Sequence, residues 1–197
     1  MDTPIVEQNT DSITPPTQTK ESSRTDDKIW ADILKLQLDG VMMHVALFEH
    51  FCIKGIKGYA AMHKHHAEEE FKHYLHVAGD YMTTYKKLVD MTNVSQPTVQ
   101  INGTTMEEIM MKGMEVYENW EKKVYEHLKK YQSELTEGKE HVDYLINDVH
   151  EELKHIHLME NDLYDGKYEK LNEWLCKQWG DISLPNFLCK NLINNNQ

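Results

Sequence analysis

The stretch HHAEEEFKHY at residues 65–74 places three histidines and three glutamates among aromatic residues. A second stretch, VHEELKHIHL at residues 149–158, has a related composition. Each contains the spacing Glu-x-x-His, as Glu70 to His73 and as Glu152 to His155. Residues three apart lie on the same face of a helix, so each pair can present a carboxylate and an imidazole together. Two such pairs on separate helices favour one shared site over two solvated faces.

The composition is typical of one globular domain behind a polar tail. The chain has 197 residues, of which 40% are hydrophobic, so it can bury a substantial core. Residues 1–26 are rich in Thr, Ser, Pro, Gln and acids, which predicts a disordered tail before a domain at 27–197. The three cysteines, Cys52, Cys176 and Cys189, match no zinc or redox motif.

The charge balance and the hydropathy exclude several classes of partner. A formal net charge of −12 argues against a general nucleic-acid binder, since phosphate neutralisation needs a basic face. No apolar run approaches the roughly 20 residues that span a bilayer, and the N-terminus has no apolar segment typical of a signal peptide. We therefore expect a cytoplasmic protein without a membrane partner. An outer apolar strip at Leu36, Met43 and Leu47 favours a homo-oligomer.

The apolar periodicity predicts an all-α fold. Four long helices are expected at about 27–52, 59–90, 105–134 and 139–163, with a short fifth helix at about 167–178. The first and third links are short, so they form antiparallel hairpins. The second link, 91–103, is long enough to cross the bundle from end to end. This connectivity predicts a four-helix bundle with one long crossover.

Polar side chains interrupt the apolar face of every long helix. At about 100° per residue, the first helix has Gln37 and His44 on this face, and the second has Glu70 and His63 inside it with His66 and His73 at its border. The third helix has Glu121 on the face and Glu118 one step away from it. The fourth has Glu152 on the face and His155 at its edge. Unpaired buried carboxylates are costly and would repel one another. Mixed carboxylate and imidazole ligands suit iron, manganese or zinc better than calcium or magnesium. The sequence therefore predicts a metal site inside the bundle.

The segment GYAAMHKHHAEEEFKHYLHV at residues 58–77 resembles the second helix of bacterial ferritins, and the likeness to the ferritin-like superfamily extends over about residues 30–163. This resemblance implies a ferritin-like bundle that binds Fe(II), oxidises it with O2 or H2O2, and stores it as Fe(III) in a multi-subunit shell. It implies that Glu70, His73, Glu152 and His155 are metal ligands, with Glu121 as the acid of the third helix.

One departure from the ferritin pattern lies in the first helix. Counting back the ferritin spacing reaches Gln37 rather than a glutamate, and glutamine is a poorer ligand. His44 lies on the same face, where ferritins often have a tyrosine, and can substitute as a ligand. The expected ligand set is His44, Glu70, His73, Glu121, Glu152 and His155. Whether it holds one iron or two, and whether it acts as a ferroxidase, stays open.

Three alternatives also stay open. The segment HFCIKG at residues 50–55 resembles Dps-type mini-ferritins, which implies an intersubunit iron site built from His50, His63, His76 and Asp80. The acidic tail lacks the charge that Dps-type DNA binding needs. The second alternative is a non-enzymatic helical bundle that scaffolds partners or merely sequesters metal. The third keeps the carboxylate site inside the bundle but makes the protein an oxidase of a small substrate.

Overall fold

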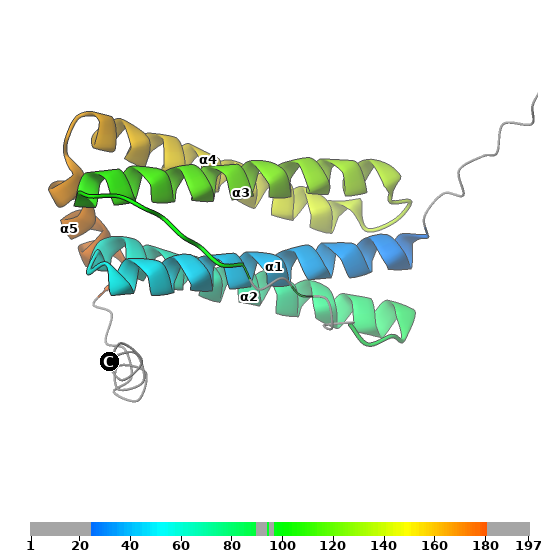
Figure 1. Cartoon of the computed structure of the whole chain (residues 1–197). Coiled ribbons are helices and arrows are strands. Elements are labelled where there is room, and N and C mark those ends of the chain that lie inside the picture. The colour runs from blue at the N-terminus through cyan, green and yellow to red at the C-terminus, as the bar shows by residue number, and fades with distance from the viewer. Residues whose placement is uncertain (1–24, 90–93, 95–96, 181–197) are drawn as a thin grey trace, which may run out of the picture.

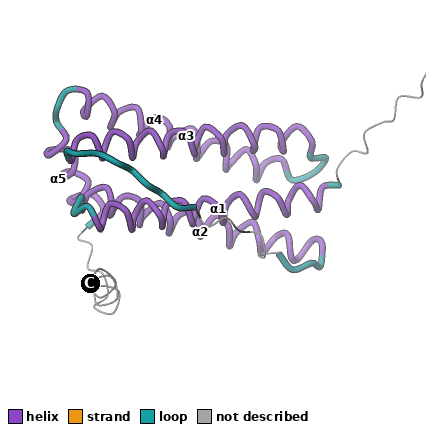
Figure 2. The backbone as a smooth tube through the Cα atoms, in the orientation of Figure 1, coloured by secondary structure: helices purple, strands orange, loops and turns teal. Residues whose placement is uncertain are grey.

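The computed structural model describes residues 25–89, 94 and 97–180. The expected N-terminal tail and the segment 181–197 lie almost entirely outside the described residues. Every regular element in the described part is a helix (Figure 2), which confirms the all-α class. The helices are α1 (Asp26–Ile53), α2 (Lys57–Tyr85), α3 (Met106–Glu134), α4 (Lys139–Tyr164) and α5 (Tyr168–Trp179).

The four long helices lie side by side with the directions that the link lengths predict. The pairs α1–α2 and α3–α4 are antiparallel hairpins, whereas α2 and α3 run in the same direction (Figure 1). Residues 97–105 run along the bundle toward the start of α3 (Figure 1). The short helix α5 packs mainly against α2. None of the described helices combines the length and the apolar character that a membrane span needs.

The helix ends follow local sequence signals. The side chain of Thr105 accepts a hydrogen bond from the backbone N–H of Glu108 at 3.1 Å, and Glu108 in turn accepts one from the backbone N–H of Thr104 at 2.7 Å. This reciprocal arrangement satisfies N–H groups that a helix N-terminus leaves open. Helix α2 ends five residues before the expected position, because Lys86 adopts the left-handed conformation with φ 55°.

The apolar core has two parts with a polar layer between them. One part gathers around Trp30, Ile33 and Leu128, and the other around Phe51, Tyr59 and Met114. Between these positions on each long helix lie the buried polar side chains. Leu36 and Leu47 belong to the two core clusters, so the expected outer apolar strip is wrong and gives no support to a subunit interface.

Gly58 marks a close approach between α2 and α5. Its backbone N–H donates to Asn172 Oδ1 at 2.8 Å, and an added Cβ would overlap the backbone carbonyl oxygen of Asn172. Because that oxygen belongs to a packed helix, Gly58→Ala should lower the free energy of unfolding by about 1–3 kcal/mol. A Cβ added at Gly79 in the same helix would have no atom within 4 Å, so Gly79→Ala should raise the free energy of unfolding slightly. Urea unfolding measures both, and equal shifts would contradict the close approach.

Candidate metal centre

The polar layer of the core forms one cluster that draws on all four long helices. Its members, which we call the buried centre, are His44 from α1, His63, His66 and Glu70 from α2, Tyr117 and Glu121 from α3, and Glu152 from α4. His44, His63 and Glu121 have no exposed surface, and the others are at most 8% exposed. Among the described residues, no lysine or arginine side chain is buried. The carboxylates therefore have no permanent cation beside them.

One half of the buried centre is internally satisfied. Glu152 Oε2 accepts a hydrogen bond from the Tyr117 hydroxyl at 2.7 Å, and Glu152 Oε1 lies 3.2 Å from His66 Nδ1. Burial alone would raise the pKa of Glu152, but the charge and the hydrogen bond of His66 outweigh it and lower this pKa to about 2. Glu152 raises the pKa of His66 in turn, against the effect of burial. This half behaves as a buried ion pair.

The other half of the buried centre has polar atoms without partners. His44 Nδ1 lies 3.1 Å from His63 Nδ1, and His44 Nε2 lies 3.7 Å from Glu121 Oε1. Neither carboxylate oxygen of Glu121, nor Nε2 of His44 or His63, has a hydrogen-bond partner of normal geometry among the described residues. Such groups are expensive to bury unless something else satisfies them.

A third group adjoins the centre on the side of α4. His73 Nδ1 lies 4.0 Å from Glu70 Oε2 and 3.5 Å from Asp148 Oδ2, and His73 Nε2 lies 3.3 Å from the Tyr144 hydroxyl. The side chains of His73 and Asp148 are partly exposed, so this group lies between the buried centre and solvent. Asp148 therefore adds a carboxylate on the solvent side of Glu70.

The electrostatics of the unsatisfied half favour a neutral, proton-bearing state. Burial, followed by the charges of neighbouring carboxylates, raises the pKa of Glu70 and Glu121 well above their ordinary values. Burial and the neighbouring imidazole of His66 lower the pKa of His44 to about 3. Burial and the two neighbouring imidazoles also lower the pKa of His63 well below its ordinary value. Neutral imidazoles carry the free lone pairs that transition metals bind. A cation would allow both carboxyl groups to ionise.

The structure brings four of the six expected ligands into the buried centre. His44, Glu121 and Glu152 each offer a ligand atom within 4.8 Å of the other two. Glu70 is also buried, and its charge helps to raise the pKa of Glu121. Glu121 is the buried acid of α3. The second choice, Glu118, instead forms an ion pair with Lys122 at 2.6 Å. His73 lies at the outer edge of the centre.

His155 does not belong to the buried centre. Its side chain is exposed and lines a groove between α4 and α5, together with Trp174 and Trp179. Asp148, seven residues earlier and on the same side of α4, is instead covered by His73 of α2. The structure therefore does not bring His155 together with the other expected ligands.

Four residues of the site were not in the expected ligand set. They are His63, His66, Tyr117 and Asp148. His63, His66 and Glu70 are separated by three and four residues, and this spacing was the signal that all three share one face of α2. Tyr117 recurs with the apolar residues of α3, and the sequence around Asp148 has no feature that distinguishes it from a surface acid. Gln37 is 3% exposed, and its Oε1 has no hydrogen-bond partner among the described residues.

The histidines and the aspartate of the Dps-type alternative do not gather in one place. His63 has no exposed surface and belongs to the buried centre, so it cannot face a partner subunit. His76 lies 13 residues further along α2, which is about 20 Å at 1.5 Å per residue. His76 and Asp80 instead face His141 of the same chain.

A groove leads from the surface to the buried centre. It has a volume of about 680 Å³ and is lined by both apolar and charged side chains, mostly of α4 and α5, together with His66 of α2. The rings of His66 and Trp179 lie 6.2 Å apart. Because His66 also contacts Glu152, the groove reaches the satisfied half of the centre.

The chain was compared with known proteins. No model of a known protein family matches it. No curated protein matches it either. What the protein does is therefore inferred from the chemistry of the buried centre.

Proposed function

We propose that the buried centre binds Fe(II) inside a ferritin-like helical bundle and that the protein oxidises this iron with O2 or H2O2. The observation that carries the proposal is the convergence of His44, Glu121 and Glu152 from three helices, with ligand atoms within 4.8 Å of one another. A mixed set of one imidazole and two carboxylates suits iron, manganese or zinc. Polar atoms without partners at the same place explain why a cation would be stabilising there.

Each residue of the centre has a distinct role in this proposal. His44 and Glu121 supply ligand atoms that no other group uses, and His63 lies against His44 to fix its ring. Glu152 is held by Tyr117 and His66, so its carboxylate keeps one orientation before an ion arrives. This preorganisation lowers the cost of assembling the site.

Glu70 and His73 provide for a second ion next to the first. Glu70 is buried, its charge raises the pKa of Glu121, and its Oε2 has no hydrogen-bond partner among the described residues. His73 and Asp148 lie between Glu70 and solvent. Iron contributes the redox chemistry: each Fe(II) gives one electron to the oxidant and becomes Fe(III). The groove between α4 and α5 gives a small oxidant a route to His66.

The proposal is tested by anaerobic titration of the metal-free protein with Fe(II), followed by oxygen. We expect tight binding and a near-ultraviolet ferric absorbance that rises faster than in protein-free buffer. Glu121→Gln keeps the shape of the side chain but loses the charge, and it should slow this rise at least about tenfold. Glu126→Gln, on the exposed side of α3, should leave it unchanged.

Two outcomes would contradict the proposed function. One is oxidation that is equally fast in the wild type, in Glu121→Gln and in buffer alone. The other is a protein that takes up no iron, manganese or zinc under any condition, which would favour the non-enzymatic scaffold. Native mass measured on the same samples tests whether the chain also forms the homo-oligomeric shell that storage of Fe(III) requires.

A further inference from the structure

A second group of metal-ligating side chains lies on the surface between α2 and α4. His76 and Asp80 are four residues apart on α2, and His141 belongs to the first turn of α4. Their ligand atoms all lie within 4.8 Å of one another, and His141 Nε2 is 3.9 Å from Asp80 Oδ2. The ring centroids of His76 and His141 lie 6.0 Å apart. None of the three belongs to the buried centre.

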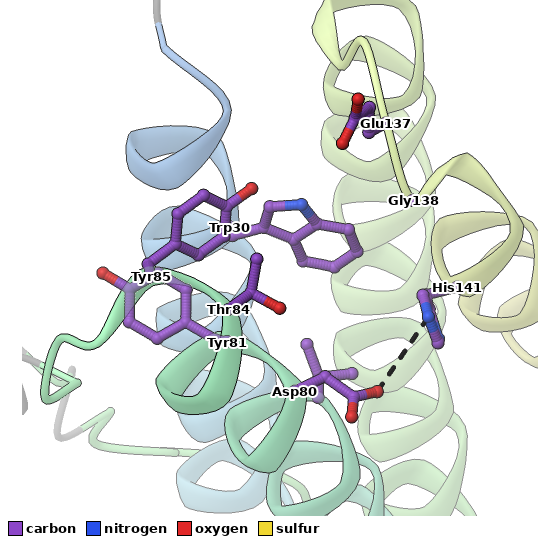
Figure 3. Close-up of a pocket in the computed structure, with 9 residues that line it drawn as sticks. Trp30, Asp80, Tyr81, Thr84, Tyr85, Glu137, Gly138 and His141 are labelled. Atoms are coloured by element: carbon purple, nitrogen blue, oxygen red, sulfur yellow. Dashed lines mark ion pairs between the residues drawn. The ribbon is translucent and has the colours of Figure 1, made fainter.

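The surroundings hold the group in place and leave room for water. Figure 3 shows Asp80 and His141 pointing toward one another, and both line a cavity of about 170 Å³ that Trp30 also lines. The edge of the Trp30 ring packs against His141 at 6.1 Å between centroids. On the other side, a cavity of about 450 Å³ is lined by both His76 and His141. A metal ion here can therefore complete its coordination with solvent.

The local charges also favour a cation. Glu137 lines the first cavity and Glu140 the second, and Lys72 is the one basic side chain among the described residues that line either cavity. Two histidines and one carboxylate, with an open position for water, form a donor set typical of Zn2+. Residues four apart on one helix can bind the same ion from one face.

We propose that His76, Asp80 and His141 bind one Zn2+ or a similar divalent transition metal ion and so join α2 to α4. Binding draws its ligands from two helices that the sequence separates by more than fifty residues. An ion that binds the folded chain and not the unfolded chain raises its stability by mass action. The site thus acts as a clamp on the side of the bundle where two cavities separate α2 from α4.

The test is a calorimetric titration of the full-length, metal-free protein with Zn2+, paired with thermal unfolding. The Glu121→Gln variant serves as the background, because it disables the buried centre without touching the surface group. In this background, we expect one Zn2+ to bind and to raise the midpoint of thermal unfolding. Adding His76→Gln or His141→Gln should each weaken this binding at least tenfold and remove the thermal shift. Adding His127→Gln on α3 should change neither quantity.

Three results would overturn the clamp. The first is Zn2+ binding of equal affinity with and without His76→Gln and His141→Gln. The second is loss of binding with His76→Gln but unchanged binding with His141→Gln, since an ion held only by α2 does not join two helices. The third is binding without a thermal shift. The side chains of His76, His127 and His141 are at least partly exposed, so adding these substitutions to the Glu121→Gln background should not prevent folding, and circular dichroism of every variant before the titration verifies this. Fe(II) oxidation is not measured, so failure here is independent of the proposed function.

Discussion

Replacing Glu121 with leucine should raise the free energy of unfolding of the metal-free protein by about 1–4 kcal/mol and abolish binding at the buried centre. Glu121 has no exposed surface, and neither of its oxygens has a hydrogen-bond partner of normal geometry among the described residues. Burial therefore costs the metal-free protein free energy at this group, and it raises the pKa of Glu121 well above its ordinary value. Leucine has a similar size, removes that cost and offers no ligand atom.

Urea unfolding in the presence of a chelator measures the first effect, and Fe(II) titration measures the second. The matched control is Glu126→Leu on the same helix, where the exposed side chain should change stability by no more than about 0.5 kcal/mol. A stable variant that binds no metal would show that the carboxylate is retained for binding at the expense of stability. Destabilisation by Glu121→Leu would instead mean that a structural partner already satisfies Glu121.

The helical periodicity of the sequence was sufficient to predict the bundle and its buried acids. Glu70, Glu121 and Glu152 recur in step with the apolar residues of their helices, and a helix that packs on one side must bury whatever lies on that face. The lengths of the three links were sufficient to predict the directions of the four long helices. These predictions depend only on the apolar periodicity of each helix and on the length of each link, and both can be read from the sequence of one segment.

Whether His155 and His66 are buried depends on which neighbouring helix packs against each of them, and the sequence of one helix does not state this. Angle around a helix axis predicts which side a residue faces, but not which neighbour covers that side at a given height. Asp148 and His155 share one side of α4, yet His73 packs against Asp148, whereas His155 lines an open groove. His66 is drawn inward at the border of α2 by its contact with Glu152, 86 residues away. Contacts of this range arise from the packing of four helices together.

Replacing Glu152 with alanine should have the opposite effect on stability to the change at Glu121. Glu152→Ala removes the acceptor of the Tyr117 hydroxyl and the partner of His66, and it leaves both groups buried. Breaking a buried ion pair at one side costs about 3–5 kcal/mol. Glu152→Gln keeps an acceptor for Tyr117 and loses the charge, so it should cost less. Glu151→Ala, an exposed neighbour paired with Lys154 at 2.6 Å, should change stability by less than about 1 kcal/mol.

The cost of Glu152→Gln should also depend on pH, because the ion pair needs a charged group on both sides. The pKa of Glu152 falls from 4.5 to about 2 in the folded protein, so its contribution to stability is present above pH 4.5 and is lost as the pH falls toward 2. The pKa of His66 is raised from 6.5, so its contribution is present below pH 6.5 and is lost as the pH rises through the folded value.

The difference in unfolding free energy between the wild type and Glu152→Gln should therefore be largest between about pH 4.5 and 6.5. Urea unfolding of both proteins across pH 3–8 in chelator, with Glu151→Ala as the reference, measures this difference. A difference that stays constant across this range would mean that His66 is neutral in the folded protein. Glu152 would then be held by Tyr117 alone, and neither half of the buried centre would contain an ion pair in the absence of a metal ion.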